Sequence, residues 1–259
     1  MQSEIEFCDE GAILSAKEPL GDGLAHLTFQ APRIAKAARP GQFVMLYPLS
    51  EARSHDPLLG RPMAIAGASG GAVEICLSVA GRGTEIIYSL PIGARCRMRG
   101  PLGSGFSAPR DKIMLVGGGI GVAPLIFAHV FYGASASSMR FVMGIPHKGW
   151  ESFVNWVSRR VQALHVWSDD GSIGEKGSAV DAACALYSGE EIWTCGPVTM
   201  LRSLVRRIPD ARISASLERR MACGYGGCHG CVVPTANGPK RVCRDGPVFN
   251  AEEVRWDEL

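Results

Sequence analysis

The pattern of apolar and polar positions changes near residue 106 and divides the chain into parts with different predicted folds. Before that point, short apolar segments alternate with breaks rich in Pro and Gly, at the spacing of roughly 8–12 residues typical of an all-β barrel or sandwich. One short helix is predicted at 84–90. The predicted strands cover 12–20, 23–31, 41–49, 61–67, 71–80 and 93–103. Residues 1–106 therefore predict an antiparallel β-barrel domain.

Between 107 and 210 compact apolar strands alternate with helical segments. Such alternation indicates a parallel sheet with helices on its faces. The predicted strands cover 112–117, 140–145, 163–170 and 191–196, and the predicted helices cover 121–133, 150–161, 177–187 and 197–208. This part predicts a Rossmann-like α/β domain.

The remaining segment, 211–259, contains a cluster of cysteines and little else that predicts a core of its own. A segment this short usually needs a staple such as a metal. We therefore expect a small third domain that is held together by its cysteines.

Composition narrows the class of protein. Of the 259 residues 46% are hydrophobic and 20% are charged, which is ordinary for a soluble globular protein. The formal net charge of +2 predicts no strong field for nucleic acid. No apolar run reaches the roughly 18 residues that span a bilayer, and the N-terminus lacks the layout of a signal peptide. We expect a cytoplasmic protein, in which disulfides are rare.

The cysteine cluster has a specific spacing. Cys223-x4-Cys228-x2-Cys231 is followed, after eleven residues, by Cys243. This spacing matches plant-type [2Fe–2S] sites and differs from zinc ribbons, which pair two C-x2-C knuckles. Three thiolates must reach a small inorganic core from one loop, so glycines are expected there to allow unusual backbone angles. These glycines are Gly224, Gly226, Gly227 and Gly230.

Alternatives remain for the cysteine cluster. A structural zinc site would use the same thiolates, and a disulfide is the further alternative. His229 lies inside the loop, as a Rieske-type ligand would, but four cysteines already complete the ligand set. We assign His229 no ligand role.

Two glycine-rich turns follow strands in the middle part. Residues 116–124 and 194–200 each end a strand and open a helix, where N–H groups can receive a phosphate. Such turns at the carboxyl edge of a parallel sheet face one crevice and together predict a dinucleotide site, although a tight turn without a ligand is the alternative for each. The candidate residues are Gly117, Gly118, Gly119, Gly121, Cys195, Gly196 and Pro197.

Other polar groups near this crevice have two interpretations. Cys195 either borders the nicotinamide ring or is a buried structural cysteine. Asp169 and Asp170 either line the crevice or form a solvated turn. The end of the second strand carries His147 and Lys148 and no acidic residue that would hold a ribose 2′-hydroxyl.

The barrel region offers a second anion site. Arg61 begins a predicted strand, and Gly83 and Thr84 lie at a loop-to-helix turn. An arginine near a helix N-terminus suits a flavin diphosphate. Alone, each feature is an ordinary surface arginine or turn. Their order along the chain, with barrel, nucleotide fold and then cluster, favours the binding function.

With these motifs the chain resembles the ferredoxin-reductase-like flavoprotein superfamily. Within it, the chain resembles the electron-transfer subunits of NAD-dependent dihydroorotate dehydrogenases over essentially its whole length. The resemblance rests on residues 60–67, 81–87, 117–125, 195–197 and 216–249. It implies FAD on the barrel domain, NAD(H) on the middle domain and a [2Fe–2S] cluster on Cys223, Cys228, Cys231 and Cys243. The implied flavin-site residues are Arg61, Pro62, Met63, Ala64, Cys76, Leu77, Ser78, Gly83 and Thr84.

The chain departs from the superfamily pattern at two places. Ala64 stands where Arg-Pro-x-Ser has its serine, and Leu77 and Ser78 replace a common Tyr-Arg pair. Both changes remove side-chain contacts to the flavin, and the backbone N–H of Ala64 is left to serve the ring.

The resemblance implies an electron relay. Nicotinamide exchanges two electrons as a hydride, a cluster passes one electron, and a flavin does both, so it belongs between them. The partner would be a catalytic FMN-type dehydrogenase subunit in a hetero-oligomer, a heterotetramer, that oxidises dihydroorotate to orotate in pyrimidine biosynthesis. No G-x-S-x-G or H-E-x-x-H motif predicts a catalytic side chain.

Several alternatives to this function stay open. The chain would also suit the equivalent subunit of a ferredoxin:NADP oxidoreductase or a sulfhydrogenase, or a self-sufficient reductase of small acceptors. A zinc-stapled binding module without flavin is the non-enzymatic alternative. NADP(H) stays open beside NAD(H).

Overall fold

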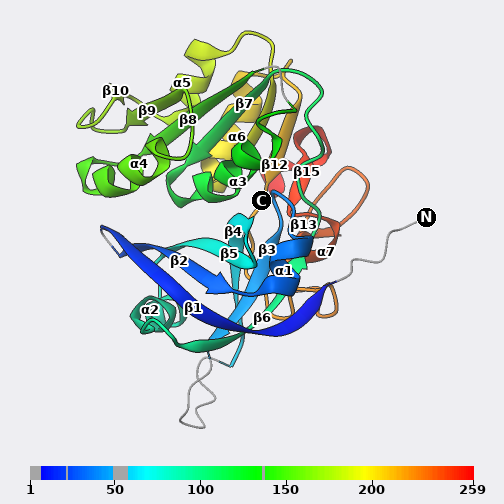
Figure 1. Ribbon diagram of the computed structural model, residues 1–259. Helices are drawn as coiled ribbons and strands as arrows, with labels where there is room; N and C mark the ends of the chain where they lie inside the picture. The colour runs from blue at the N-terminus through cyan, green and yellow to red at the C-terminus, as the bar shows by residue number, and fades with distance from the viewer. Residues whose placement is uncertain (1–6, 22, 49–57, 136–137) are drawn as a thin grey trace.

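The computed structural model describes residues 7–21, 23–48, 58–135 and 138–259. Figure 1 shows a β-barrel, an α/β layer above it and a C-terminal segment beside both. The predicted combination of antiparallel barrel, parallel α/β sheet and small cysteine-rich segment is confirmed. Leu49, the end of the strand predicted at 41–49, lies outside the described residues. In the described part of the chain no helix is long and apolar enough to cross a bilayer.

Six antiparallel strands close the barrel in the order β1-β2-β5-β4-β3-β6. Apolar side chains such as Leu14, Leu27 and Phe29 alternate inward and fill it. The strands are β1 (Cys8–Gly21), β2 (Leu24–Gln30), β3 (Phe43–Pro48), β4 (Arg61–Ser69), β5 (Ala72–Ser78) and β6 (Arg95–Leu102), with helices α1 (Pro32–Ala37) and α2 (Arg82–Ser89). The sequence pattern indicated only α2, because α1 is six residues long and buries the single side chain of Ile34.

A seven-stranded sheet in the order β10-β9-β8-β7-β11-β12-β15 forms the second domain. All neighbouring pairs are parallel except β12 with β15. The strands are β7 (Ile113–Gly118), β8 (Met139–Ile145), β9 (Leu164–Ser168), β10 (Glu175–Lys176), β11 (Glu191–Cys195), β12 (Ile213–Ser216) and β15 (Val248–Asn250). The helices are α3 (Val122–Tyr132), α4 (Glu151–Ser158), α5 (Ala179–Leu186) and α6 (Val198–Arg207). α3 and α4 pack in one core and α5 and α6 in the other, so helices cover both faces.

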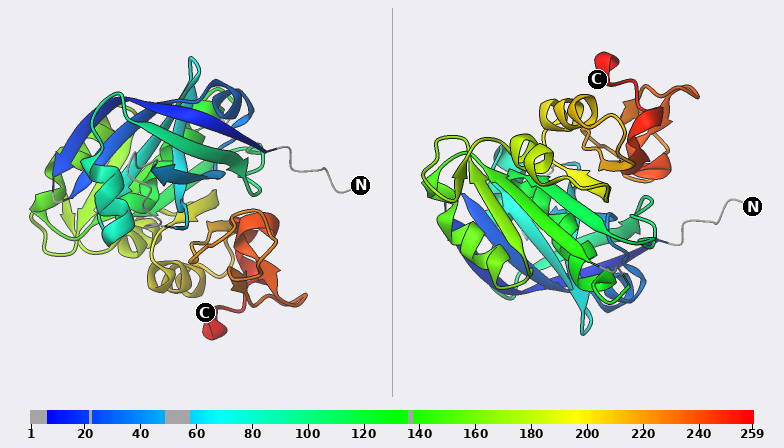
Figure 2. Two further views of the ribbon diagram at one scale, coloured as in Figure 1. Left: turned by 90° about the horizontal axis from the view of Figure 1, so that it is seen from below. Right: turned by 90° about the horizontal axis from the view of Figure 1, so that it is seen from above.

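The C-terminal segment shares its core with the sheet. The chain runs through β12, leaves the sheet, forms the cysteine loop and returns as β15 beside β12. Between them lie β13 (Val232–Val233), β14 (Lys240–Arg241) and α7 (Val242–Asp245). Val233, Val242 and Phe249 are buried in the same apolar cluster as Leu201 of α6. The segment, which lies beside the α/β layer (Figure 2), therefore has no separate core, because its apolar residues belong to a core that begins in the sheet.

A His–Glu pair on the barrel lies beneath α4. His26 Nε2 lies 2.9 Å from Glu74 Oε2, and the His26 ring packs on Trp156 of α4 with centroids 4.7 Å apart. The hydrogen bond with His26 lowers the pKa of the Glu74 carboxyl, burial opposes this effect, and the charges of His26 and Arg160 assist it. The barrel therefore contacts the α/β domain here through the ring of His26, which Glu74 holds by a hydrogen bond.

Glu74→Gln is expected to lower the free energy of unfolding by about 1–2 kcal/mol, because His26 loses a charged partner. The folded-state pKa of Glu74 lies below the ordinary 4.5, so this stabilisation is present above that value and is lost as the pH falls through the folded pKa. Urea unfolding between about pH 3 and pH 7 measures it. The stabilities of wild type and variant should converge at low pH.

Glu85→Gln is the matched control for this experiment, since Glu85 is an exposed carboxylate on α2. It should leave the free energy of unfolding within about 0.5 kcal/mol of wild type. Equal stability of Glu74→Gln and wild type near pH 7 would contradict the proposed contribution of the pair.

Candidate functional site

A cleft of ≈ 1090 Å³ opens between the barrel and the α/β domain. Its far wall is the turn at Ile120 and Pro124, and residues 218–221 close one side. All nine residues that the resemblance implies for a flavin line it: Arg61, Pro62, Met63, Ala64, Cys76, Leu77, Ser78, Gly83 and Thr84. The structure thus brings β4, β5 and the start of α2 together around one space large enough for a bulky cofactor.

Arg61 and Gly83 form the cationic end of this cleft. A Cβ at Gly83 would lie 1.9 Å from Arg61 Nε, so the guanidinium rests against the backbone of the first turn of α2. The Oγ1 of Thr84 accepts hydrogen bonds from the N–H groups of Ala80 and Gly81, at 2.9 and 3.1 Å, and so shapes the turn. A guanidinium beside a helix N-terminus is complementary to a diphosphate, and these residues fit FAD.

A second cleft of ≈ 670 Å³ lies at the carboxyl edge of the parallel sheet. Five of the predicted dinucleotide-site residues line it: Gly118, Gly119, Gly121, Gly196 and Pro197. A Cβ at Gly121 would lie 2.6 Å from the carbonyl oxygen of Cys195, so the two turns meet backbone to backbone. Asp169 also lines the cleft.

Two predicted residues lie elsewhere. Gly117 does not line the second cleft. A Cβ there would lie 2.5 Å from Val122 Cγ1, so Gly117 allows α3 to pack closely on β7. Cys195 is 1% exposed and lines a smaller cavity of ≈ 130 Å³ between the two clefts. Burial raises the pKa of its thiol, so Cys195 is a buried cysteine that also lines this cavity.

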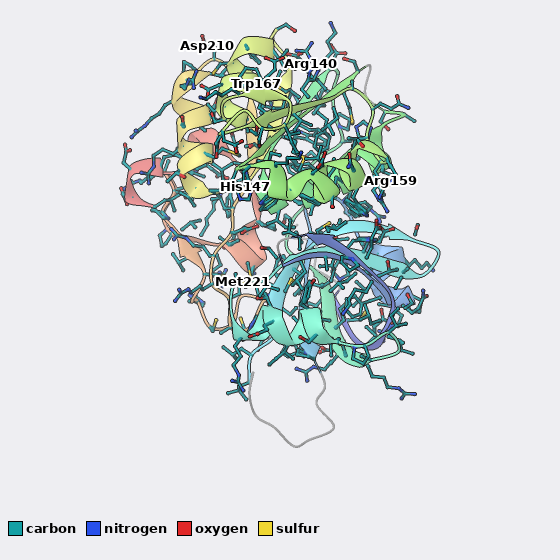
Figure 3. The ribbon with its side chains drawn as sticks, turned by 90° about the vertical axis from the view of Figure 1, so that its left-hand side faces the viewer. Arg140, His147, Arg159, Trp167, Asp210 and Met221 are labelled. Atoms are coloured by element: carbon teal, nitrogen blue, oxygen red, sulfur yellow. The ribbon has the colours of Figure 1, made fainter. Side chains whose placement is uncertain are left out.

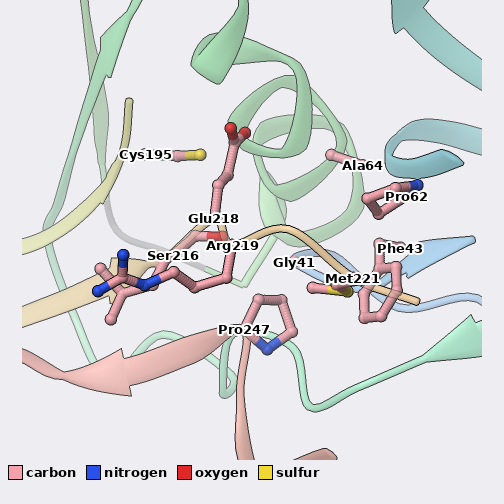
Figure 4. Close-up of a pocket in the computed structure, with 11 residues that line it drawn as sticks. Gly41, Phe43, Pro62, Ala64, Cys195, Ser216, Glu218, Arg219, Met221 and Pro247 are labelled. Atoms are coloured by element: carbon pink, nitrogen blue, oxygen red, sulfur yellow. The ribbon is translucent and has the colours of Figure 1, made fainter. Parts of the chain in front are cut away.

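Glu218 lies where these spaces meet, and the sequence analysis missed it. It lines both clefts and the small cavity between them. Figure 4 shows its carboxyl between Cys195 and Ala64. Burial raises the pKa of this carboxyl. The position of Glu218 could have indicated it, because the residue follows the end of β12 at the same sheet edge as the two glycine turns. However, β12 is only four residues long, and its sequence pattern was too short to predict a strand.

The four predicted cluster cysteines lie in two pairs. The N–H of Cys228 donates to Cys223 Sγ at 3.4 Å, and the N–H of Cys243 donates to Cys231 Sγ at 3.4 Å. No disulfide joins them. Among the described residues no three Cys, His, Asp or Glu side chains converge enough to hold a single metal ion. A two-iron core takes two thiolates on each iron, so this paired arrangement fits it better than one tetrahedral zinc.

The backbone of the loop stabilises the thiolate of Cys223. Burial alone would raise the pKa of Cys223, but N–H donors of Cys228, Tyr225 and Gly227 lower it to about 6. Gly224 has a φ of +79°, and a Cβ there would lie 2.4 Å from Met45 Cγ, so the loop packs directly on the barrel. Gly226 also has a positive φ. The third residue of the loop with a positive φ is His229, at +57°, and neither Gly227 nor Gly230 has one.

A short segment joins the first cleft, called the flavin cleft from here on, to the cysteines. Met221 lines the flavin cleft and the small cavity, and Cys223 follows two residues later. Figure 3 shows Met221 at the level of the barrel and His147 at the lower edge of the α/β layer. The first cluster cysteine is therefore only two residues away in sequence from a residue that lines the flavin cleft.

Comparisons with known proteins agree with this geometry. Residues 218–255 match the family model described as the iron-sulfur cluster binding domain of dihydroorotate dehydrogenase B. The dihydroorotate dehydrogenase B (NAD(+)) electron transfer subunit of Clostridium acetobutylicum is 35% identical over 83% of this chain and 86% of its own length. Its counterpart in Geobacillus kaustophilus is 34% identical over 95% and 98%.

The fold is also known from solved structures. A chain from the structure of the NADH-dependent reduced ferredoxin-NADP oxidoreductase superposes with a TM-score of 0.84 and 28% identity, covering 96% of this chain and 91% of that one. The barrel, the parallel sheet and the flavin cleft define a ferredoxin-reductase-like flavoprotein oxidoreductase. More narrowly, the chain belongs to the dihydroorotate dehydrogenase B electron transfer subunit family.

Proposed function

We propose that this chain relays electrons between a catalytic partner subunit and NAD+ through a [2Fe–2S] cluster and FAD, for the oxidation of dihydroorotate to orotate. The observation that carries the proposal is the junction of the two clefts at Ile120 and Glu218, beside the segment that leads to Cys223. The substrate, dihydroorotate, and the role as one subunit of a larger enzyme are taken from the names of the relatives. Bound FAD would supply the chemistry that links one-electron steps to a hydride step.

Each part of the site has a role in this relay. Arg61 and the first turn of α2 would hold the flavin diphosphate, and the backbone N–H of Ala64 would serve its ring. The turns at Gly118–Gly121 and Gly196 would bind the dinucleotide phosphates. Cys223 and Cys228 would hold one iron, and Cys231 and Cys243 the other.

The dinucleotide is proposed to be NAD(H). Asp169 lines the second cleft, the proposed dinucleotide cleft. Its carboxylate would repel the 2′-phosphate of NADP. His147 would otherwise favour that phosphate, but its Nδ1 accepts a hydrogen bond from the N–H of Gly149 at 3.1 Å and stabilises the local turn. The charge that faces the cleft therefore favours NAD(H).

The partner is proposed to be an FMN-type dehydrogenase subunit in a heterotetramer, docked near the cluster. Cys228 is exposed, so electrons have a route out of the protein at this loop. A second candidate is the equivalent subunit of a ferredoxin:NADP oxidoreductase, favoured by the structural similarity at a TM-score of 0.84.

Reconstitution tests the proposal and separates the candidates. The anaerobically purified chain should contain iron, sulfide and FAD, and with a dihydroorotate-oxidising FMN subunit it should reduce NAD+ faster than NADP+. The same preparation with reduced ferredoxin as donor should be slow. Rapid transfer from ferredoxin and none from the dehydrogenase subunit would favour the second candidate, and a protein that lacks both flavin and sulfide would refute any relay.

A further inference from the structure

We propose that the outer wall of the barrel at β6, beside the cysteine loop, is the docking surface for an acidic face of the catalytic partner subunit. This inference rests on the proposed relay and specifies where, and through which chemistry, the partner binds. Side chains alternate along β6, so Arg95, Arg97 and Arg99 point outward while Cys96 and Met98 pack inside the barrel. The wall, next to β1 in Figure 1, therefore presents a row of guanidinium groups to the outside.

Only part of the positive charge of this wall is balanced. Asp9 of β1 lies opposite Arg99, and its Oδ2 accepts a hydrogen bond from Arg99 Nη2 at 2.8 Å. Its Oδ1 lies 3.9 Å from Arg97 Nε. Among the residues that the structure describes, Asp9 is the one carboxylate in an ion pair with these three arginines, so an excess of two positive charges remains. The electrostatic complement of such a surface is a partner face that carries carboxylates.

Aromatic rings hold the guanidinium groups of this wall in place. The guanidinium carbon of Arg97 lies 4.1 Å from the ring centroid of Tyr47, and that of Arg99 lies 5.3 Å from the centroid of Tyr225. Phe7 stacks on Tyr225, with centroids 6.0 Å apart, and Tyr225 is 47% exposed. Arginine and tyrosine are enriched among the residues that dominate binding energy at interfaces. Because these side chains are already ordered, binding would cost them little conformational entropy.

The wall is continuous with the cysteine loop. Tyr225 belongs to that loop, and a Cβ at Gly227 would lie 3.0 Å from its ring. The next residue, Cys228, is exposed. None of the three arginines of the wall lines the flavin cleft or the dinucleotide cleft. A partner on this wall would therefore reach the proposed cluster while both clefts stay open to their own ligands.

Binding measurements on the complete, cofactor-loaded chain test the docking surface. The probe is the dihydroorotate-oxidising FMN subunit that the proposed relay requires, immobilised on a sensor. Arg97→Glu is expected to raise the dissociation constant at least about tenfold, mainly by slowing association, and to reduce its dependence on salt. Wild-type binding should itself weaken at high salt.

Variants of Tyr225 test the aromatic part of the surface. Tyr225→Ala is expected to accelerate dissociation about tenfold, because it removes an aromatic anchor and the support of Arg99. Tyr225→Phe keeps the ring and should bind as wild type does. Iron, sulfide and FAD contents of each variant should equal those of wild type, which separates a docking defect from a damaged loop.

Arg159→Glu is the matched control for the charge reversal. The side chains of Arg97 and Arg159 are 48% and 58% exposed, and each faces one carboxylate, but Arg159 lies just after α4 on the α/β domain. Arg159→Glu should leave the dissociation constant within about twofold of wild type.

Two results would overturn the proposal. One is a wild-type dissociation constant and salt dependence in Arg97→Glu. The other is an equal loss of affinity in Arg159→Glu, which would show an effect of net charge and not of this wall. Failure of the relay is recognised separately, because the wild-type chain would then lack flavin or sulfide, or would form no complex with the FMN subunit at any salt concentration.

Discussion

Cys228→Ser is expected to remove the iron and acid-labile sulfide, from about two of each per chain to nearly none, while FAD stays bound. The serine hydroxyl is a poor ligand for iron compared with a thiolate, and the loss of one ligand leaves one iron of a two-iron core incompletely held. The flavin is unaffected because Cys228 does not line the flavin cleft. Iron and sulfide assays and the visible spectrum of anaerobically purified protein measure the outcome.

Cys184→Ser is the matched control, since Cys184 is a partly buried cysteine on α5, away from the loop. It should retain full iron, sulfide and flavin. A full complement of iron and sulfide in Cys228→Ser would make the ligand assignment wrong. Zinc without iron in the wild-type protein would instead support the zinc-stapled alternative.

Gly83→Ala is expected to weaken FAD binding at least tenfold, which is about 1.4 kcal/mol. The new Cβ would lie 1.9 Å from Arg61 Nε, so the guanidinium must move away from the helix turn and from the diphosphate. Charge-assisted hydrogen bonds to such a group are worth about 1.5–3 kcal/mol. Titration of the apoprotein with FAD, followed by flavin fluorescence, gives the dissociation constants.

Two measurements separate a binding defect from a folding defect. Alanine is a better helix former than glycine, so the thermal midpoint of apo Gly83→Ala should not fall. Gly11→Ala, whose Cβ would meet nothing within 4 Å, should bind FAD as wild type does. FAD affinity in Gly83→Ala equal to that of wild type would show that Arg61 does not hold the cofactor.

Local motifs predicted the parts of the site that depend on local backbone geometry. Arg61, Gly83 and the loop cysteines could be proposed from the sequence because a helix turn or a metal loop needs particular residues at short spacing. Glu218 depends instead on the positions of three strand ends, which are far apart in sequence. Gly117 was included for the reverse reason, since a glycine that allows close helix packing is indistinguishable in sequence from one that approaches a phosphate.

The barrel and the strand–helix alternation were predicted because hydrophobic periodicity reports burial within each element. That periodicity could not show which core the C-terminal segment joins. β12 and β15 are four and three residues long, and their pairing is a long-range contact across the whole cysteine segment. The sequence therefore indicated a small segment held by its cysteines, and it could not show that this segment shares a core with the sheet.

Because of this shared core, the cysteine loop is not a separate domain on a flexible linker. Its entry and exit strands are adjacent in one sheet, and its turn is seated on Met45 of the barrel. A tethered redox carrier must swing and dock before each transfer, so its rate depends on linker length and viscosity. In the proposed relay the separation of cluster and flavin would instead be fixed by the fold, and the only docking event would be with the partner subunit.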